Sequence, residues 1–179
     1  MLTLSSCVSQ IHSGVNRSEP DRIRSAIEQE EGALEERNVQ EETPLISAAR
    51  QEKWEIVRLL VEEGADINAE TEQGGLTALR YAIMAGNYEM TTYLIENGAD
   101  VSQENEHGWT PLHTAARYGH MEILNFLIQE GADINARTDK GVTPTRAASD
   151  AGYTDIVVRL TLLQQERQER ANDENPADP

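Results

Sequence analysis

Apolar residues in the middle of the chain form two helical stripes, each followed by a glycine. Residues 110–133 read TPLHTAARYGHMEILNFLIQEGAD, and Gly119 and Gly131 close the two stripes. Thr110 followed by Pro111 suits a helix start, because proline has no N–H to lose in the first turn. The pattern predicts a short helix over about residues 111–118 and a second helix ending before Gly131. Their apolar faces consist of Leu112, Ala115, Ala116, Ile123, Leu124, Leu127 and Ile128.

Both ends of this stretch recur at a fixed interval. Gly-Ala-Asp occurs at residues 64–66, 98–100 and 131–133, at intervals of 34 and 33 residues. A Thr-Pro-Leu triplet or a close variant begins at Thr43, Thr77, Thr110 and Thr143, at intervals of 34, 33 and 33 residues. The segments between one Gly-Ala-Asp and the next threonine are polar and contain glycine, as turns do. A period of this length indicates a repeat protein built from two helices and a turn.

These units resemble the ankyrin repeat, whose signature is T-P-L-H-x-A. His113 takes the signature histidine position, whereas Ile46, Arg80 and Arg146 replace it in the other units. The resemblance therefore does not imply the histidine's capping hydrogen bond at those three positions. It implies an all-α ankyrin-repeat solenoid, in which helix-turn-helix units are joined by hairpin-like loops.

The register divides the chain into segments. We expect a flexible N-terminal segment at 1–7 and a degenerate capping repeat at 8–42, in which Ile23 and Ile27 match Ile123 and Leu127 if Glu31 takes the glycine position. We expect the end of the last helix and an acidic disordered tail over 164–179, with the tail from Ala171 onward. The four repeats between them cover 43–76, 77–109, 110–142 and 143–163, the last with a C-terminal cap.

Composition and charge narrow the choice of partners. The chain has 38% hydrophobic residues and a net charge of -17, and it lacks an apolar run of about 18 residues. We expect a soluble, cytoplasmic protein that is monomeric alone, inserts into no membrane and binds no nucleic acid directly, because phosphates repel this charge. The carboxylates either maintain solubility or steer a basic protein surface towards the chain. Export or lipid anchoring is the alternative if the Leu4-Ser5-Ser6-Cys7 box belongs to a longer precursor.

No pattern in the chain indicates catalysis. His107, His113 and His120 lie close in sequence, but the repeat register places them at a loop tip, at a helix start and beyond a helix end, so we do not expect them to bind metal. Neither a glycine-rich phosphate loop nor a nucleophile in a recognisable triad is present. We therefore expect a protein without cofactor that is not an enzyme.

The resemblance implies that contact residues lie on a concave face, formed by loop tips and first helices. Trp109, Arg117 and Tyr118 are the main candidates, because Trp, Tyr and Arg are enriched where interfaces gain most of their affinity. The register adds Glu106, His107, Glu72, Gln73, Leu76, Met84, Ala85, Asp139, Lys140, Val142 and Asp150, and in the first repeat Gln40, Glu42, Arg50 and Gln51.

Two classes of function remain open. The protein is either a non-catalytic interaction module that acts as scaffold, adaptor or inhibitor through this face, or an acidic mimic that occupies a basic nucleic-acid-binding surface of another protein. Binding through the aromatic residues should survive added salt, and binding through charge should not. An accessory subunit that escorts an enzyme or toxin is a variant of the first class.

Overall fold

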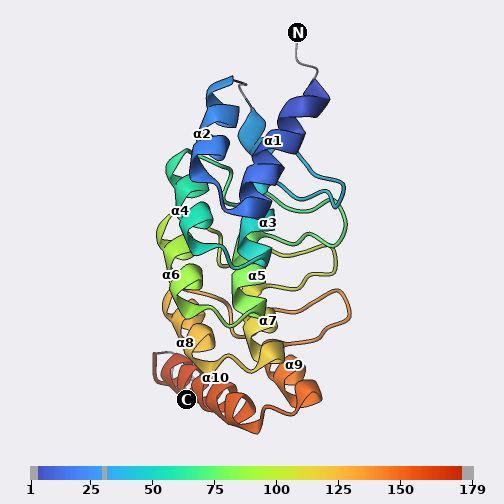
Figure 1. Cartoon of the computed structure of the whole chain (residues 1–179). Coiled ribbons are helices and arrows are strands. Elements are labelled where there is room, and N and C mark those ends of the chain that lie inside the picture. The colour runs from blue at the N-terminus through green and yellow to red at the C-terminus, as the bar shows by residue number, and fades with distance from the viewer. Residues whose placement is uncertain (1–3, 30–31, 175–179) are drawn as a thin grey trace. The chain divides into compact units, whose positions relative to one another are not determined.

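The computed structural model describes residues 4–29 and 32–174, with side chains from residue 10 to residue 172 within those ranges. In this part of the chain there are ten α-helices, one short 3-10 helix and no β-strand. The chain divides into two compact units, residues 1–100 and 101–179. The helices of each unit follow one another as helix-turn-helix pairs (Figure 1).

The first unit contains three helix pairs. They are α1 (Leu4–Arg17) with α2 (Pro20–Gln29), α3 (Pro44–Arg50) with α4 (Trp54–Glu62), and α5 (Ala78–Met84) with α6 (Tyr88–Glu96), and the 3-10 helix η1 (Ala33–Glu35) follows the first pair. The leading helices α1, α3 and α5 pack in a row, and each packs on the second helix of its own pair. Fully buried Ile11, Ile23, Leu45, Ile83 and Leu94 form the core between them.

The second unit contains two helix pairs. They are α7 (Pro111–Tyr118) with α8 (Met121–Gln129), and α9 (Pro144–Ala151) with α10 (Thr154–Glu174). Helix α7 packs against both α8 and α9, and α10 packs against α9. Leu112, Leu127 and Leu160 are fully buried, and Ala115 and Ala148 are small enough to let α7 and α9 approach closely.

A threonine starts each of the four helices that follow the long loops. Thr43, Thr77, Thr110 and Thr143 have extended backbones, and each hydroxyl accepts a hydrogen bond from the backbone N–H three residues later, at 3.2 to 3.4 Å. These bonds satisfy N–H groups that have no partner within the helix. The repeated threonine is therefore a local start signal that does not depend on the rest of the fold.

The Gly-Ala-Asp triplets end the second helices. Gly131 has a φ of 95°, in the left-handed region that favours glycine. Ala132 N–H then donates to the Leu127 carbonyl at 2.9 Å, and the Asp133 carboxylate accepts from Asn135 N–H at 2.9 Å. Each residue of the triplet thus has a separate role, since glycine turns the chain, buried alanine closes the helix, and aspartate caps the following turn.

The N-terminal pair differs in detail from the sequence expectation. Helix α1 begins at Leu4, within the segment expected to be flexible, while residues 1–3 and Glu31 lie outside the described residues, as does the Cys7 side chain. Ile23 is fully buried, but Ile27 is only half-buried and Ala26 takes the second core position of α2. The left-handed glycine after this helix is Gly32, with a φ of 97°.

The C-terminal helix is longer than expected. Helix α10 has 21 residues, whereas the second helices of the preceding three repeats have 9. It extends past Ala171, where the disordered tail was predicted to begin, and residues 175–179 lie outside the described residues. The extension is rich in Gln, Glu and Arg and contains neither glycine nor proline, so its helix propensity is high.

Candidate functional site

The candidate site lies in the second unit and is centred on Trp109. Its loop is closed by Asn105, whose side-chain oxygen accepts from His107 N–H at 3.0 Å and from Trp109 N–H at 2.9 Å. Asn105 N–H also donates to the Trp109 carbonyl at 3.0 Å. Trp109 is therefore held by the backbone of a closed turn, and its half-buried ring lies between the loop and α7.

The His113 ring packs against the Trp109 ring. The two rings make an edge contact with centroids 5.3 Å apart. Thr110 N–H donates to His113 Nδ1 at 3.2 Å, so the ring proton is on Nε2, which donates to the Val142 carbonyl 2.9 Å away. His113 thus completes the capping box of α7 and ties the start of this repeat to the loop of the next one.

The corresponding residues of the other repeats do not make a capping box. Ile46, Arg80 and Arg146 each donate a backbone N–H to the threonine hydroxyl, and the reciprocal side-chain bond is found only at His113 among the described helix starts. Arg80 is 3% exposed, and burial lowers its pKa to about 10, although the charge of Glu70 acts in the opposite direction. The sequence therefore correctly singled out His113.

Two clefts share Trp109 and Val142 as lining residues. The first, of about 350 Å³, is completed by Arg117, Ala147, Asp150 and Ala151. The second, of about 250 Å³, is completed by His107, Thr138, Asp139 and Lys140. We call the two together the Trp109 cleft. Its walls come from α7, α9 and the loops before them, and Asp139 N–H links the two loop tips by donating to the His107 carbonyl at 3.2 Å.

The first cleft is lined by both charged and apolar side chains. The Arg117 guanidinium carbon lies 5.5 Å from the centre of the Trp109 ring, which is within the range of a cation–π contact. Asp150 forms an ion pair with Arg146 at 2.7 Å, and this hydrogen bond raises the pKa of Arg146. Val142 and Ala147 provide the apolar surface between these charges. The cleft can therefore accept an apolar side chain that has a polar group beside it.

The structure brings seven of the predicted contact residues together in this cleft: His107, Trp109, Arg117, Asp139, Lys140, Val142 and Asp150. Tyr118 does not line it, since its ring stacks on His120 with centroids 6.4 Å apart and is 40% exposed. Glu106 is exposed at the loop tip without lining either part. Reasoning from sequence missed Thr138, Ala147 and Ala151, although the repeat register of the alanines was a usable signal.

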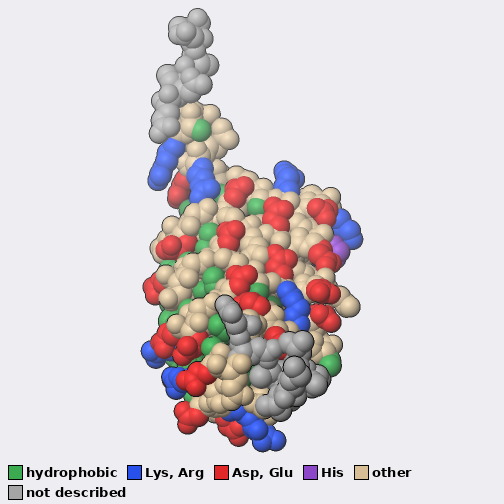
Figure 2. All heavy atoms as spheres, turned by 90° about the horizontal axis from the view of Figure 1, so that it is seen from above, with side chains coloured by type: hydrophobic (Ala, Val, Ile, Leu, Met, Phe, Trp, Pro, Cys, Tyr) green, Lys and Arg blue, Asp and Glu red, His purple; other side chains and the backbone are tan. Residues whose placement is uncertain are grey.

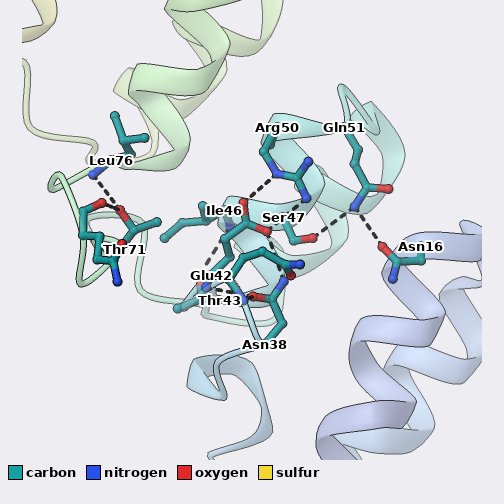
Figure 3. Close-up of polar contacts among 12 residues, drawn as sticks. Asn16, Asn38, Glu42, Thr43, Ile46, Ser47, Arg50, Gln51, Thr71 and Leu76 are labelled. Atoms are coloured by element: carbon teal, nitrogen blue, oxygen red, sulfur yellow. Dashed lines mark hydrogen bonds and ion pairs between the residues drawn. The ribbon is translucent and has the colours of Figure 1, made fainter.

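The remaining predicted contacts lie in the first unit. Glu72 and Gln73 are exposed, and Leu76 and Met84 are half-buried. Thr71 closes their loop, because its hydroxyl accepts from Leu76 N–H at 3.0 Å and donates to the Gln73 carbonyl at 2.9 Å (Figure 3). These side chains remain predicted contacts.

The prediction that Glu42 is a contact residue is wrong. Glu42 is 3% exposed, and its carboxylate accepts from Arg50 Nε at 2.6 Å, from Arg50 Nη2 at 3.1 Å and from Asn38 Nδ2 at 3.0 Å (Figure 3). The bond to this carboxylate raises the pKa of Arg50. Glu42 therefore fastens the loop of the first repeat to α3, and the sequence could not reveal this because the fastening depends on tertiary contacts.

Neither a metal cluster nor a membrane helix is found in the described part of the chain. Groups of three or more His, Cys, Asp or Glu side chains that could hold a metal ion do not occur there. His113 is buried, His107 lines the Trp109 cleft and His120 stacks on Tyr118, so the three histidines have separate surroundings. None of the described helices combines the length and hydrophobicity that crossing a lipid bilayer requires.

Comparison with family models agrees with the repeated helix pairs. A model of three ankyrin repeats matches residues 11–105, and a single ankyrin repeat matches residues 107–139. Together these matches cover more than half of the chain, which therefore belongs to the ankyrin-repeat family. No curated protein matches the chain. Ankyrin repeats are in general protein–protein interaction modules, and the fold is accordingly that of a binding protein.

Proposed function

We propose that this protein is a non-catalytic interaction module that binds a segment of a partner protein in the Trp109 cleft. The observation that carries the proposal is the half-buried Trp109 ring, which lines both parts of the cleft and lies beside the exposed Arg117. Tryptophan and arginine are enriched among the residues whose truncation costs most affinity, and such residues occupy the centres of interfaces. Scaffold, adaptor and inhibitor are all roles that such a surface serves.

The size of the cleft is suited to anchoring a few partner side chains. Its two parts have volumes of about 350 and 250 Å³. A stable protein interface buries roughly 800 Å² on each partner, so the contact must extend beyond the cleft. The exposed Tyr118 and Glu106 would add to it within the second unit.

The test is a pull-down from extract of the cells that express the protein, comparing wild type with Trp109→Ala. Tyr88→Ala is the matched control, since Tyr88 is 40% exposed but lies in α6 of the first unit. A second variant, Ala151→Tyr, fills the cleft from the exposed end of α9 without removing a supporting contact. We expect both cleft variants to lose the same captured protein and the control to retain it. Capture that is unchanged by both cleft variants contradicts the proposal.

Salt distinguishes this proposal from a charge-driven antagonist of a basic surface. Figure 2 shows Asp and Glu side chains scattered over the face in view, with Lys and Arg side chains between them. On this face such scatter favours a solubility role for the acidic residues over a mimic, which needs its charges gathered in one place. A partner that dissociates in high salt but binds the cleft variants as well as wild type would instead support the charge-driven antagonist.

A further inference from the structure

Arg117 is an exposed cation fixed at the edge of the Trp109 cleft. It is the last but one residue of α7, and its guanidinium lies over the Trp109 ring at 5.5 Å. Within the residues whose side chains are described, none of the carboxylates forms an ion pair with it. A stacked guanidinium has already lost part of its freedom, so binding a further group to it costs less entropy than binding a free arginine does.

The acidic residue on the opposite side of the first cleft is already neutralised. Asp150 forms the 2.7 Å ion pair with Arg146, four residues earlier on α9. The second cleft is lined by one cation, Lys140, and one carboxylate, Asp139. Arg117 is therefore the cation of the first cleft that makes no ion pair within the described residues, and it lies beside apolar Val142 and Ala147 in a chain whose net charge is -17.

We infer that the partner segment is a linear peptide that places an apolar side chain on Trp109, Val142 and Ala147 and pairs one Asp or Glu carboxylate with Arg117. This inference rests on the proposed function and names the chemistry of its partner. Arginine forms two parallel hydrogen bonds with a carboxylate, which gives both affinity and orientation. The overall negative charge repels a run of acidic residues, so the segment carries one carboxylate beside its apolar anchor.

The inference reverses the expectation from composition. A chain with net charge -17 is expected to attract basic partners over distances comparable with the Debye length, about 8 Å at physiological salt. Inside the cleft, the nearest charge determines which group of the partner binds, and that charge is Arg117. The overall negative charge can still attract basic residues elsewhere on the partner while one carboxylate pairs with Arg117.

The experiment selects binders from a displayed library of random linear peptides on immobilised wild-type protein and on Arg117→Glu. We expect peptides selected on wild type to share an apolar residue and an acidic residue at a fixed spacing. We expect peptides selected on Arg117→Glu to keep the apolar residue and carry Lys or Arg at the acidic position. Arg137→Glu is the matched control, since it changes the net charge equally at an exposed site outside the Trp109 cleft, and it should select the same peptides as wild type.

A double-mutant cycle then measures the pair directly. The strongest selected peptide and its Asp→Asn or Glu→Gln analogue are titrated against wild type and Arg117→Gln by fluorescence anisotropy. We expect the analogue to bind wild type about tenfold more weakly, and both peptides to bind Arg117→Gln equally. Circular dichroism confirms that each variant is folded.

The outcomes separate this inference from the proposed function. Selected peptides that lose affinity for Trp109→Ala and Ala151→Tyr but show no preference for an acidic residue overturn the role of Arg117 and leave the cleft as the binding site. Selected peptides that bind both cleft variants with the same affinity as wild type overturn the proposed function as well. Failure of wild type to enrich any peptide contradicts the claim that a short linear segment is sufficient.

Discussion

Replacing His113 with alanine tests the link between the capping box and the shape of the cleft. His113 is 0% exposed, and its ring makes three polar contacts: with Thr110 N–H at 3.2 Å, with the Thr110 hydroxyl at 2.8 Å and with the Val142 carbonyl at 2.9 Å. Alanine removes all of them. It also removes the edge contact with Trp109.

The expected cost follows from these losses. The two hydrogen bonds to backbone groups are worth about 1 to 1.5 kcal/mol each, and the ring contact adds about 0.5 to 1.5 kcal/mol. The threonine hydroxyl still caps the backbone N–H of residue 113, so the helix start itself is retained. We therefore expect His113→Ala to lower the free energy of unfolding by about 3 to 4 kcal/mol, a large part of the roughly 5 to 15 kcal/mol typical of a domain.

Arg146→Ala is the matched control, because Arg146 occupies the same position of the next repeat. Its side chain is 69% exposed and its partner Asp150 is 56% exposed, so water screens this ion pair and its loss should change stability little. Urea unfolding followed by far-ultraviolet circular dichroism gives both values. If His113→Ala costs no more than Arg146→Ala, the capping box does not stabilise the second unit, and the reasoning is wrong.

Three further predictions concern the core, the first loop and pH. Leu127→Asp buries a charge at a fully buried position and should abolish cooperative unfolding of the second unit, whereas an unchanged melting curve would contradict the assigned register. Glu42→Gln weakens the bonds to Arg50 and should cost about 1 to 2 kcal/mol in urea unfolding, and no measurable loss would show that the buried carboxylate is not needed. Burial lowers the pKa of His12, so below about pH 6.5 the unfolded chain binds a proton that the folded chain does not. The free energy of unfolding therefore decreases as the pH is lowered. His12→Leu should make the unfolding free energy less dependent on pH between about 5 and 7, and an identical slope in both proteins would exclude His12 as the cause.

Local signals made the helix pairs predictable from sequence. The threonine hydroxyls and the glycines after the second helices act within one turn of their own helix, so their meaning does not depend on distant residues. The length of α10 was missed because the apolar stripe ends near Leu163 and helix propensity alone continues to Glu174. Glu42 was missed because its burial depends on Asn38 and Arg50, which a repeat register does not describe.

The site could be predicted only as far as the repeat register defines positions. Trp109, Arg117 and Val142 meet because stacking places the start of one repeat beside the loop of the next. The direction of an exposed ring is not fixed by register, and Tyr118 accordingly lies on His120 instead of in the cleft. The supporting role of Asn105 depends on turn geometry that the sequence shows only as an asparagine three residues before Gly108.

The measurement that tests the central claim most directly is site-specific photocrosslinking to the captured partner. A photoreactive amino acid is placed at Lys140, an exposed residue that lines the Trp109 cleft, and in a second protein at Gln129, an exposed residue of α8 in the same unit that does not. The account predicts a crosslink to the partner from position 140 and none from position 129. A crosslink from position 129 alone would place the binding surface on the second helices and contradict the account.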